Sequence, residues 1–208
     1  MAFELLPEAR QRMEDWQELR LPDSEPYFPY QPLPASERLA YELMNWDNCG
    51  TMLDLFADDP HPFVEPSLKS RPAFDYYLID VLDYRHYSAK HGSCDWFLRY
   101  QGQYIGVLHL YDLNVAIYER KHPPCFVGYA IAEAHRQQGF AEEALRHLLQ
   151  QIPLIFERYD VMAEPKLQNV ASRHLLQKVG FVEKRMSRGN QTSIWYKDLR
   201  DDFKHLTT

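Results

Sequence analysis

The stretch from Cys125 to Glu164 constrains the fold of this chain more strongly than any other part of its sequence. It begins with the apolar run CFVGYAIAE, passes through AHRQQGF into the amphipathic pattern AEEALRHLL, and ends with the apolar run RYDVMAE. This pattern predicts a strand, a corner, a helix that Pro153 ends, and a second strand. Two strands that are joined through a helix lie parallel in one sheet, with a right-handed crossover.

The other segments predict an α/β fold of the α+β type, with one mixed sheet and helices on both of its faces. Apolar spacing predicts helices over residues 3–20, 47–60, 71–92 and 169–180, and strands over residues 36–46, 94–100, 103–113, 181–187 and 192–198. Asp47 or Asn48 is expected to cap the second of these helices. Asn169 caps the last one, which Gly180 closes. A tight turn at Gln101-Gly102 joins two of the strands.

A proline-rich segment separates the N-terminal helix from the rest of the chain. Residues 21–34 read LPDSEPYFPYQPLP, and five prolines in that stretch exclude a regular element. We therefore expect residues 1–35 to form a helical extension with a linker, and residues 36–208 to form the domain. The apolar stripe of the extension predicts either a helix docked on its own domain or a dimer contact.

The composition excludes several classes of function. The chain has 30 acidic and 23 basic residues and a net charge of −7, which argues against nucleic acid or an anionic membrane surface as its partner. No apolar run reaches the ~18 residues of a membrane-spanning helix, and the early acidic residues do not suit a signal peptide. The three cysteines and nine histidines lack the spacing of a metal site or a disulfide framework. We expect a cytoplasmic monomer or homodimer without metal.

The corner before the central helix has the chemistry of an anion site. A helix N-terminus presents unpaired N–H groups and a partial positive charge. Gly139 allows the backbone to approach an oxygen atom closely, and Arg136 can add a full charge. The corner lacks the lysine of a phosphate-binding nucleotide loop and the three glycines of a dinucleotide fingerprint. Either it is an ordinary loop, or it holds a pyrophosphate through backbone amides without a metal.

Two quoted stretches resemble one protein family. VGYAIAEAHRQQGFAEEALRHLL and NVASRHLLQKVGF are similar to the GNAT superfamily of acetyl-CoA-dependent N-acetyltransferases, most of all to the branch of the ribosomal-protein alanine and serine N-acetyltransferases. The resemblance spans about Glu37 to Leu199 and is strongest from Phe126 to Phe181. It implies a mostly antiparallel sheet with one parallel, splayed strand pair, and acetyl-CoA as co-substrate.

The resemblance also implies which residues bind the co-substrate. The family's cradle motif falls on Arg136, Gln137, Gln138, Gly139, Phe140 and Ala141. In relatives, amides equivalent to those of Gln137–Ala141 hold the pyrophosphate. The backbone of Tyr129, Ala130 and Ile131 would bond the pantetheine arm. Asn169 would contact the same arm, in addition to its role as a helix cap.

The implied chemistry is the attack of a neutral amine on a thioester, which needs an oxyanion donor and a stabilised thiolate. By resemblance, the N–H of Ile131 is the oxyanion donor. The hydroxyl of Ser172 either bonds the thiolate or bonds only its own helix. The family's glutamate base and tyrosine acid correspond here to Phe126 and Leu176, so both of these proton-transfer groups are missing.

Three residues are candidate replacements for the missing base: His109, Tyr111 and Asp112. Strand alternation places His109 and Tyr111 on one face and Asp112 on the other, so only one set faces the site. Each of them can also be a simple strand-end polar residue.

A site without a strong base favours a weakly basic acceptor. A peptide α-amine has a pKa of about 8 and a lysine amine one of about 10.4, so far more of the α-amine is neutral at pH 7. We expect a small-molecule or peptide amine as acceptor. Two alternatives stay open: a non-catalytic acyl-CoA sensor on the same fold, and an interaction module that uses YFPYQPLP as its partner segment.

Overall fold

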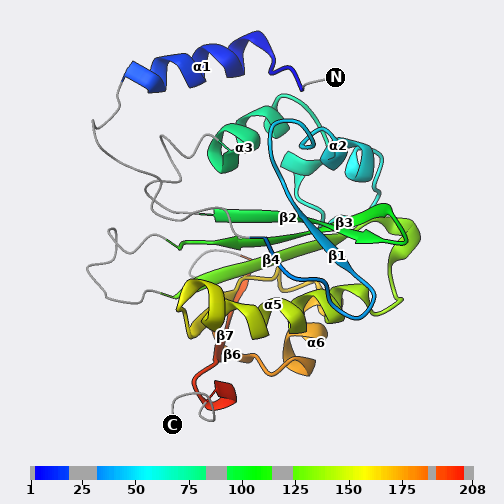
Figure 1. Cartoon of the computed structure of the whole chain (residues 1–208), viewed down its shortest axis with the longest axis vertical. Coiled ribbons are helices and arrows are strands. Elements are labelled where there is room, and N and C mark those ends of the chain that lie inside the picture. Colours follow the sequence, from blue (N-terminus) through cyan, green and yellow to red (C-terminus); the bar gives the residue numbers. More distant parts are fainter. Residues whose placement is uncertain (1–2, 19–31, 83–92, 114–123, 187–190, 204–208) are drawn as a thin grey trace.

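The computed structural model describes residues 3–18, 32–82, 93–113, 124–186 and 191–203 (Figure 1). Seven strands form one sheet in the order β1-β2-β3-β4-β5-β7-β6. Their bounds are Ala40–Leu43 (β1), Ser93–Tyr100 (β2), Gln103–Tyr111 (β3), Cys125–Ile131 (β4), Asp160–Ala163 (β5), Val182–Met186 (β6) and Ser193–Asp198 (β7). Neighbouring strands are antiparallel, except for the parallel pair β4–β5. The predicted mixed sheet is therefore confirmed.

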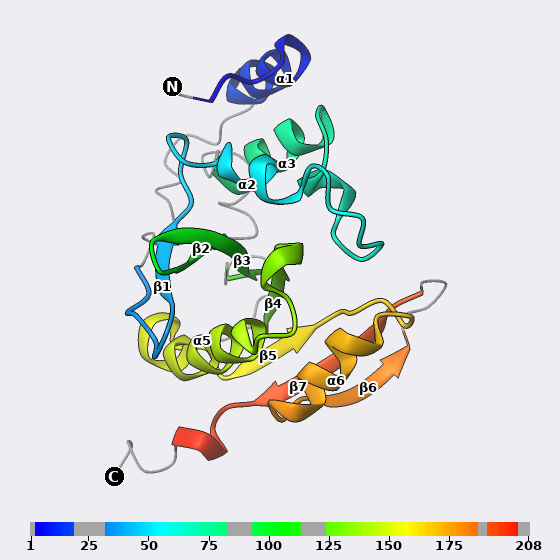
Figure 2. The same cartoon turned by 90° about the vertical axis from the view of Figure 1, so that its right-hand side faces the viewer.

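The two strands of the parallel pair separate soon after they meet. Their register contains Cys125 opposite Val161 and Phe126 opposite Met162, and β4 then continues to Ile131 without further pairing to β5. Figure 2 shows β5, β7 and β6 turning away from the other four strands. We call the place beyond Phe126, where β4 and β5 diverge, the β4–β5 fork. Its position confirms the predicted splayed pair.

Helices cover both faces of the sheet (Figure 1). One face carries α2 (Thr51–Phe56), the short 3₁₀ turn η1 (Pro66–Leu68) and α3 (Ala73–Leu82). The other carries α5 (Phe140–Phe156) and α6 (Val170–Lys178). β2 supplies side chains to both layers: Phe97 packs in the cluster with α2 and α3, whereas Trp96 and Leu98 pack in the cluster with α5 and α6. This two-sided burial follows from strand alternation between two apolar layers.

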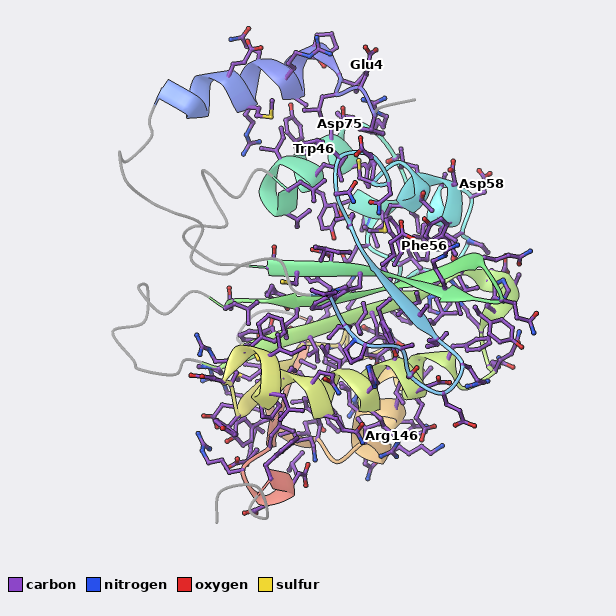
Figure 3. All side chains as sticks on the ribbon, viewed as in Figure 1. Glu4, Trp46, Phe56, Asp58, Asp75 and Arg146 are labelled. Atoms are coloured by element: carbon purple, nitrogen blue, oxygen red, sulfur yellow. The ribbon has the colours of Figure 1, made fainter. Side chains whose placement is uncertain are left out.

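The N-terminal helix α1 (Pro7–Glu18) lies on α3 of its own chain. The backbone N–H of Leu6 donates to Asp75 at 2.6 Å, and the Arg71 guanidinium, which bonds the same carboxylate, also donates to the Glu4 carbonyl at 2.6 Å. The Asp75 side chain is fully buried, and Figure 3 shows it where α3 meets the N-terminal segment. Of the two expectations for this helix, the structure shows docking on its own domain.

Several predicted boundaries are wrong. α5 does not end at Pro153 but continues to Phe156, where Glu157 takes a left-handed conformation. A proline removes one N–H donor, and the loss is tolerated here because Pro153 is packed in the core one turn from the helix end. α2 is shorter than predicted and starts after Gly50, which makes no side-chain cap, so neither Asp47 nor Asn48 caps it.

Other expectations hold or lie outside the described residues. β1 is shorter than the predicted strand over 36–46. Asn169 caps α6, since its Oδ1 accepts the N–H of Ser172 at 3.1 Å. Most of the predicted proline-rich linker, the second half of the predicted helix over 71–92 and most of the loop of the last hairpin lie outside the described residues. Within the described residues, no helix combines the length and apolar character needed to cross a membrane.

Candidate active site

The corner before α5 exposes a set of unpaired backbone donors. Gln137 and Gly139 both take left-handed conformations, with φ of 61° and 81°. The first N–H after the corner that donates to a backbone carbonyl is that of Glu143, which bonds the Gly139 carbonyl at 3.0 Å. Among the described residues, the N–H groups from Gln137 to Glu142 have no backbone acceptor. Left-handed turns that gather N–H groups at a helix N-terminus form an anion-binding concavity.

The charge of Arg136 is directed away from these donors. Its guanidinium forms an ion pair with Asp59, whose side chain is 1% exposed, and its Nε donates to the Ile131 carbonyl at 2.9 Å. Asp59 follows α2, so this arginine ties the loop beyond α2 to the end of β4. The full positive charge that the sequence places at the corner is thus paired, and the corner attracts anions through its amides.

A second arginine, which the sequence analysis missed, supports the corner from the segment before β1. Arg38 donates to the Gln138 carbonyl at 3.1 Å and to Glu143 of α5 at 2.6 Å. Its guanidinium lies over the ring of Phe140, 4.5 Å from the centroid. Phe140 is itself buried, so it anchors the start of α5 in the core. These contacts fix where the helix begins.

The edge of β4 that faces the fork carries two further backbone donors. The N–H of Ala132 donates to the Ile105 carbonyl of β3 at 2.9 Å. Because N–H directions alternate along a strand, the N–H groups of Tyr129 and Ile131 point the opposite way, toward the fork. Since β5 has already diverged there, this edge can accept an extended ligand as an additional strand would. The predicted YAI segment ends beside the corner, since Arg136 of the corner donates to the Ile131 carbonyl.

Two hydroxyl groups meet across the fork. The phenol of Tyr129, from β4, and the hydroxyl of Ser172, from α6, lie 2.9 Å apart. Burial raises the pKa of Tyr129 to about 12, although its hydrogen bond with Ser172 lowers it. The phenol is therefore protonated at neutral pH and always has a hydrogen to donate. Ser172 is consequently not a serine that bonds only its own helix.

A chain of polar and aromatic side chains lies on the opposite face of the sheet, under α3. Nδ1 of His109 forms a short contact with Asp95, and the Tyr77 hydroxyl donates to the same carboxylate oxygen at 2.7 Å. The ring of His109 stacks on that of Tyr111 at 4.8 Å, and Tyr111 stacks on Phe126 at 5.3 Å. His109 and Tyr111 therefore share one face, as alternation predicts.

Asp112 is placed differently from the expectation. β3 ends at Tyr111, and Asp112 takes a left-handed conformation with φ of 60°, so strand alternation no longer determines where it points.

Burial raises the pKa of Tyr111 well above its ordinary value, and the nearby charges of Glu164, Asp112 and Glu65 raise it further. The phenol of Tyr111 is thus neutral across the physiological range.

Asp95 and Asp59 are the other polar residues that the sequence analysis missed. Asp95 lies inside the apolar strand motif CDWFLRY, and an acidic residue at a buried strand position is the signal that was available. Nothing in the sequence indicated its partner, because pairing with His109 depends on the register of β2 and β3. Asp59 stands in the loop sequence ADDP and carries no comparable signal.

The described residues contain no cluster of three histidine, cysteine or acidic side chains suited to bind a metal ion. The three cysteines are buried free thiols. Burial raises the pKa of Cys125 to about 12, so its thiol is a poor nucleophile at neutral pH.

Comparisons with known proteins agree with this geometry. Residues 38–182 match the model of a GNAT acetyltransferase domain. No curated protein matches the sequence. Similar solved structures include a chimera of the spermidine N-acetyltransferase SpeG from Vibrio cholerae and hSSAT, with 17% identity, a TM-score of 0.63, and coverage of 83% of this chain and 100% of that chain.

Two further solved structures share the fold at low identity. AAC(6')-Ib, in complex with ribostamycin and coenzyme A, has 14% identity and a TM-score of 0.65 over 83% of this chain and 99% of that chain. RimL, a ribosomal L7/L12 alpha-N-protein acetyltransferase in complex with coenzyme A, has 13% identity and a TM-score of 0.59 over 81% and 98%. The family model covers more than half of the sequence, and the splayed sheet and amide-lined corner agree with it: the chain belongs to the GNAT family of acetyltransferases.

Proposed function

We propose that this acetyltransferase transfers the acetyl group of acetyl-CoA to a primary amine by direct attack in a ternary complex. One observation carries the proposal. The free edge of β4 ends beside the unpaired amides before α5, since Arg136 of the corner bonds the Ile131 carbonyl, so a single extended ligand with a diphosphate at one end would span both features. In this arrangement the amides of Gln137–Ala141 hold the diphosphate. The Tyr129–Ile131 edge, together with Asn169 on α6, holds the pantetheine arm.

Arg136 and Arg38 act on the diphosphate indirectly. Arg136 bonds Ile131 and Asp59, and Arg38 bonds Gln138 and Glu143, so both hold the amide-bearing corner in shape. The amides then bind the ligand at little further conformational cost, because the loop is ordered before the ligand arrives.

The reaction needs one bond made, one bond broken and one proton moved. The amine nitrogen attacks the thioester carbonyl carbon, the carbon–sulfur bond breaks, the amine loses a proton, and the thiolate leaves. The N–H of Ile131, which points toward the fork, can stabilise the oxyanion. The Tyr129 phenol, paired with Ser172, supplies a neutral hydrogen-bond donor for the thiolate. His109, Tyr111 and Asp112 are the candidates to receive the proton.

The acceptor in this proposal is a peptide α-amine or another weakly basic amine. Phe126 occupies the family's glutamate position, and its ring stacks on a neutral tyrosine, so no carboxylate lies at that point of β4. The solved relatives are named for diverse amines: spermidine, an aminoglycoside complex and a protein α-amine. A reducing compartment such as the cytoplasm suits the three buried free thiols.

The test is thiol release from acetyl-CoA with a matched panel of acceptors. The panel contains α-amino peptides, the same peptides with a blocked N-terminus and a free lysine, and spermidine, each assayed from pH 7 to 9. We expect the α-amino peptides to react fastest, with the largest advantage at the lowest pH. Faster turnover of lysine or spermidine would refute the acceptor class. Binding of coenzyme A without thiol release from any acceptor would instead identify a sensor.

A further inference from the structure

The contacts of His109 determine which of its nitrogens is free. A carboxylate only accepts hydrogen bonds, so Nδ1 of His109, which faces Asp95, carries the hydrogen. Asp95 is held in turn by the Tyr77 hydroxyl, and its side chain is 4% exposed, so bulk water does not compete for it. The other ring nitrogen, Nε2, therefore has a free lone pair while the imidazole is neutral.

The imidazole lies against the strand that leads along the fork. His109 is opposite Gly128 in the register of β3 and β4. A Cβ atom on Gly128 would lie 3.6 Å from Cβ and 3.8 Å from Cδ2 of His109, and Cδ2 is bonded to Nε2. Gly128 follows Phe126, where the parallel pairing ends, and precedes Tyr129, whose N–H points toward the fork. The His109 side chain is 23% exposed, so a ligand can reach it.

The two rival bases are less suitable. Tyr111 is a neutral phenol whose ring is packed between those of His109 and Phe126. Asp112 lies one residue beyond the end of β3, and its left-handed backbone takes it out of the strand alternation. Among the described residues, the imidazole faces Asp95 from β2, Tyr77 from α3 and Tyr111 from β3, and its neighbour on β4 is Gly128. Asp95 is thus the only carboxylic acid side chain among them.

We propose that His109 is the general base of this acetyltransferase, and that Asp95 and Tyr77 position it. As the amine nitrogen bonds the carbonyl carbon, its proton moves to Nε2, and the imidazolium that forms is stabilised by the carboxylate of Asp95. The proton then passes to the departing thiolate or to solvent, which restores the neutral ring. The inference rests on the proposed transfer reaction and adds the residue that makes it possible without the family's glutamate.

The experiment compares H109Q, D95N and Y77F with wild type, using an α-amino peptide as acceptor. General base catalysis contributes about 10² to 10⁴ in rate, so kcat of H109Q at pH 7 should fall by that factor. KM for acetyl-CoA should stay unchanged, because the amides that bind it lie elsewhere. D95N should fall between wild type and H109Q. Y77F, which loses one hydrogen bond to Asp95, should lose less than D95N.

The pH dependence separates a base from a structural residue. The neutral fraction of the amine changes with pH equally for both proteins, so it cancels when wild type and H109Q are compared at one pH. A general base works only in its unprotonated form, so the deficit of H109Q should shrink as the pH is lowered from 9 to 5, whereas a misfolded site would be impaired at every pH. H147Q is the matched control: His147 is on α5 across the sheet, where it bonds the Pro34 carbonyl and stacks on Tyr41, and its loss should leave kcat unchanged.

The outcomes distinguish this inference from the proposed function. If wild type turns over and H109Q binds coenzyme A normally with a kcat close to wild type at pH 7, the base assignment is overturned and the transferase stands. A deficit of H109Q that is constant with pH also overturns it. If H109Q does not fold, Y77F provides the test, because an unchanged kcat of Y77F would show that Tyr77 does not position the imidazole. A wild type that binds coenzyme A but never releases thiol refutes the proposed function itself.

Discussion

Gly139 offers the sharpest test of the amide-lined corner, because the chain contains a matched control for it. Its φ of 81° lies in the left-handed region, and Gly102, in the turn between β2 and β3, has a φ of 82°. A Cβ on Gly139 would meet only Arg38, at 3.4 Å, and one on Gly102 would meet nothing within 4 Å. Replacing either glycine by valine therefore imposes mainly backbone strain, and only one of the two residues belongs to the proposed cofactor site.

The expected magnitudes follow from that strain. A left-handed conformation costs a residue with a side chain about 1–2 kcal/mol, and more when the side chain is β-branched. At about 2–4 °C per kcal/mol for a chain of this size, G139V and G102V should each melt at least about 2–8 °C below wild type. Any backbone rotation that relieves this strain at the corner also turns the amides away from the diphosphate. Each lost hydrogen bond to a charged oxygen is worth about 1.5–3 kcal/mol, or about 10- to 150-fold in Kd.

The assay pairs thermal unfolding with calorimetric titration of coenzyme A for both variants. G102V should bind coenzyme A as tightly as wild type despite its lower melting temperature, and G139V should bind at least about tenfold more weakly. A G139V protein with wild-type affinity would show that the corner amides do not hold the diphosphate. Equal losses in both variants would show that binding merely follows overall stability.

Three other outcomes are expected. Y129F should lower kcat about 10- to 100-fold, with KM for acetyl-CoA unchanged, because a hydrogen bond to the thiolate is worth about 1.5–3 kcal/mol. Steady-state kinetics check this prediction, with S172A as the control, because S172A keeps the phenol and should lose less activity. D59A should destabilise the protein by about 1–3 kcal/mol in urea unfolding, because the guanidinium of Arg136 loses its buried partner, whereas D58A, an exposed neighbour, should have no effect. Folding raises the pKa of Tyr129 from 10 to about 12, so this group favours the folded state below pH 10 and loses that contribution as the pH rises through about 12. Alkaline unfolding should accordingly be shallower in Y129F, and identical curves for the two proteins would contradict the assignment.

The strand–corner–helix–strand unit was predictable because each of its signals is local. Apolar runs, one glycine and an amphipathic stretch specify the order of the elements. A helix that connects two strands of one sheet in a right-handed crossover leaves these strands parallel. The end of α5 was predicted wrongly at Pro153. A rule that considers only the effect of proline on the backbone ignores the packing energy of its buried ring. The cap of α2 was wrong for a similar reason: Asn48 bonds back into its own turn, to the N–H of Asn45 at 2.8 Å, so it is not available to the helix.

The contacts of the site were less predictable, because they join residues that are distant in sequence. Arg136 was expected to face an anion, but Asp59, 77 positions away, pairs with it. His109 was one of three equal candidates until the register placed Asp95 beside it. Local patterns identify which residues are chemically unusual, whereas only the tertiary structure shows which neighbour satisfies each of them.

The docking of the first residues on α3 has a practical side for recombinant work. Asp75 accepts the N–H of Leu6, and Tyr77, two residues further along α3, reaches Asp95. Trimming the start of the chain to aid crystallisation would remove one donor from a carboxylate that no solvent reaches, on the helix that also carries Tyr77. Shortened versions of the protein should therefore be compared by their turnover as well as by their yield.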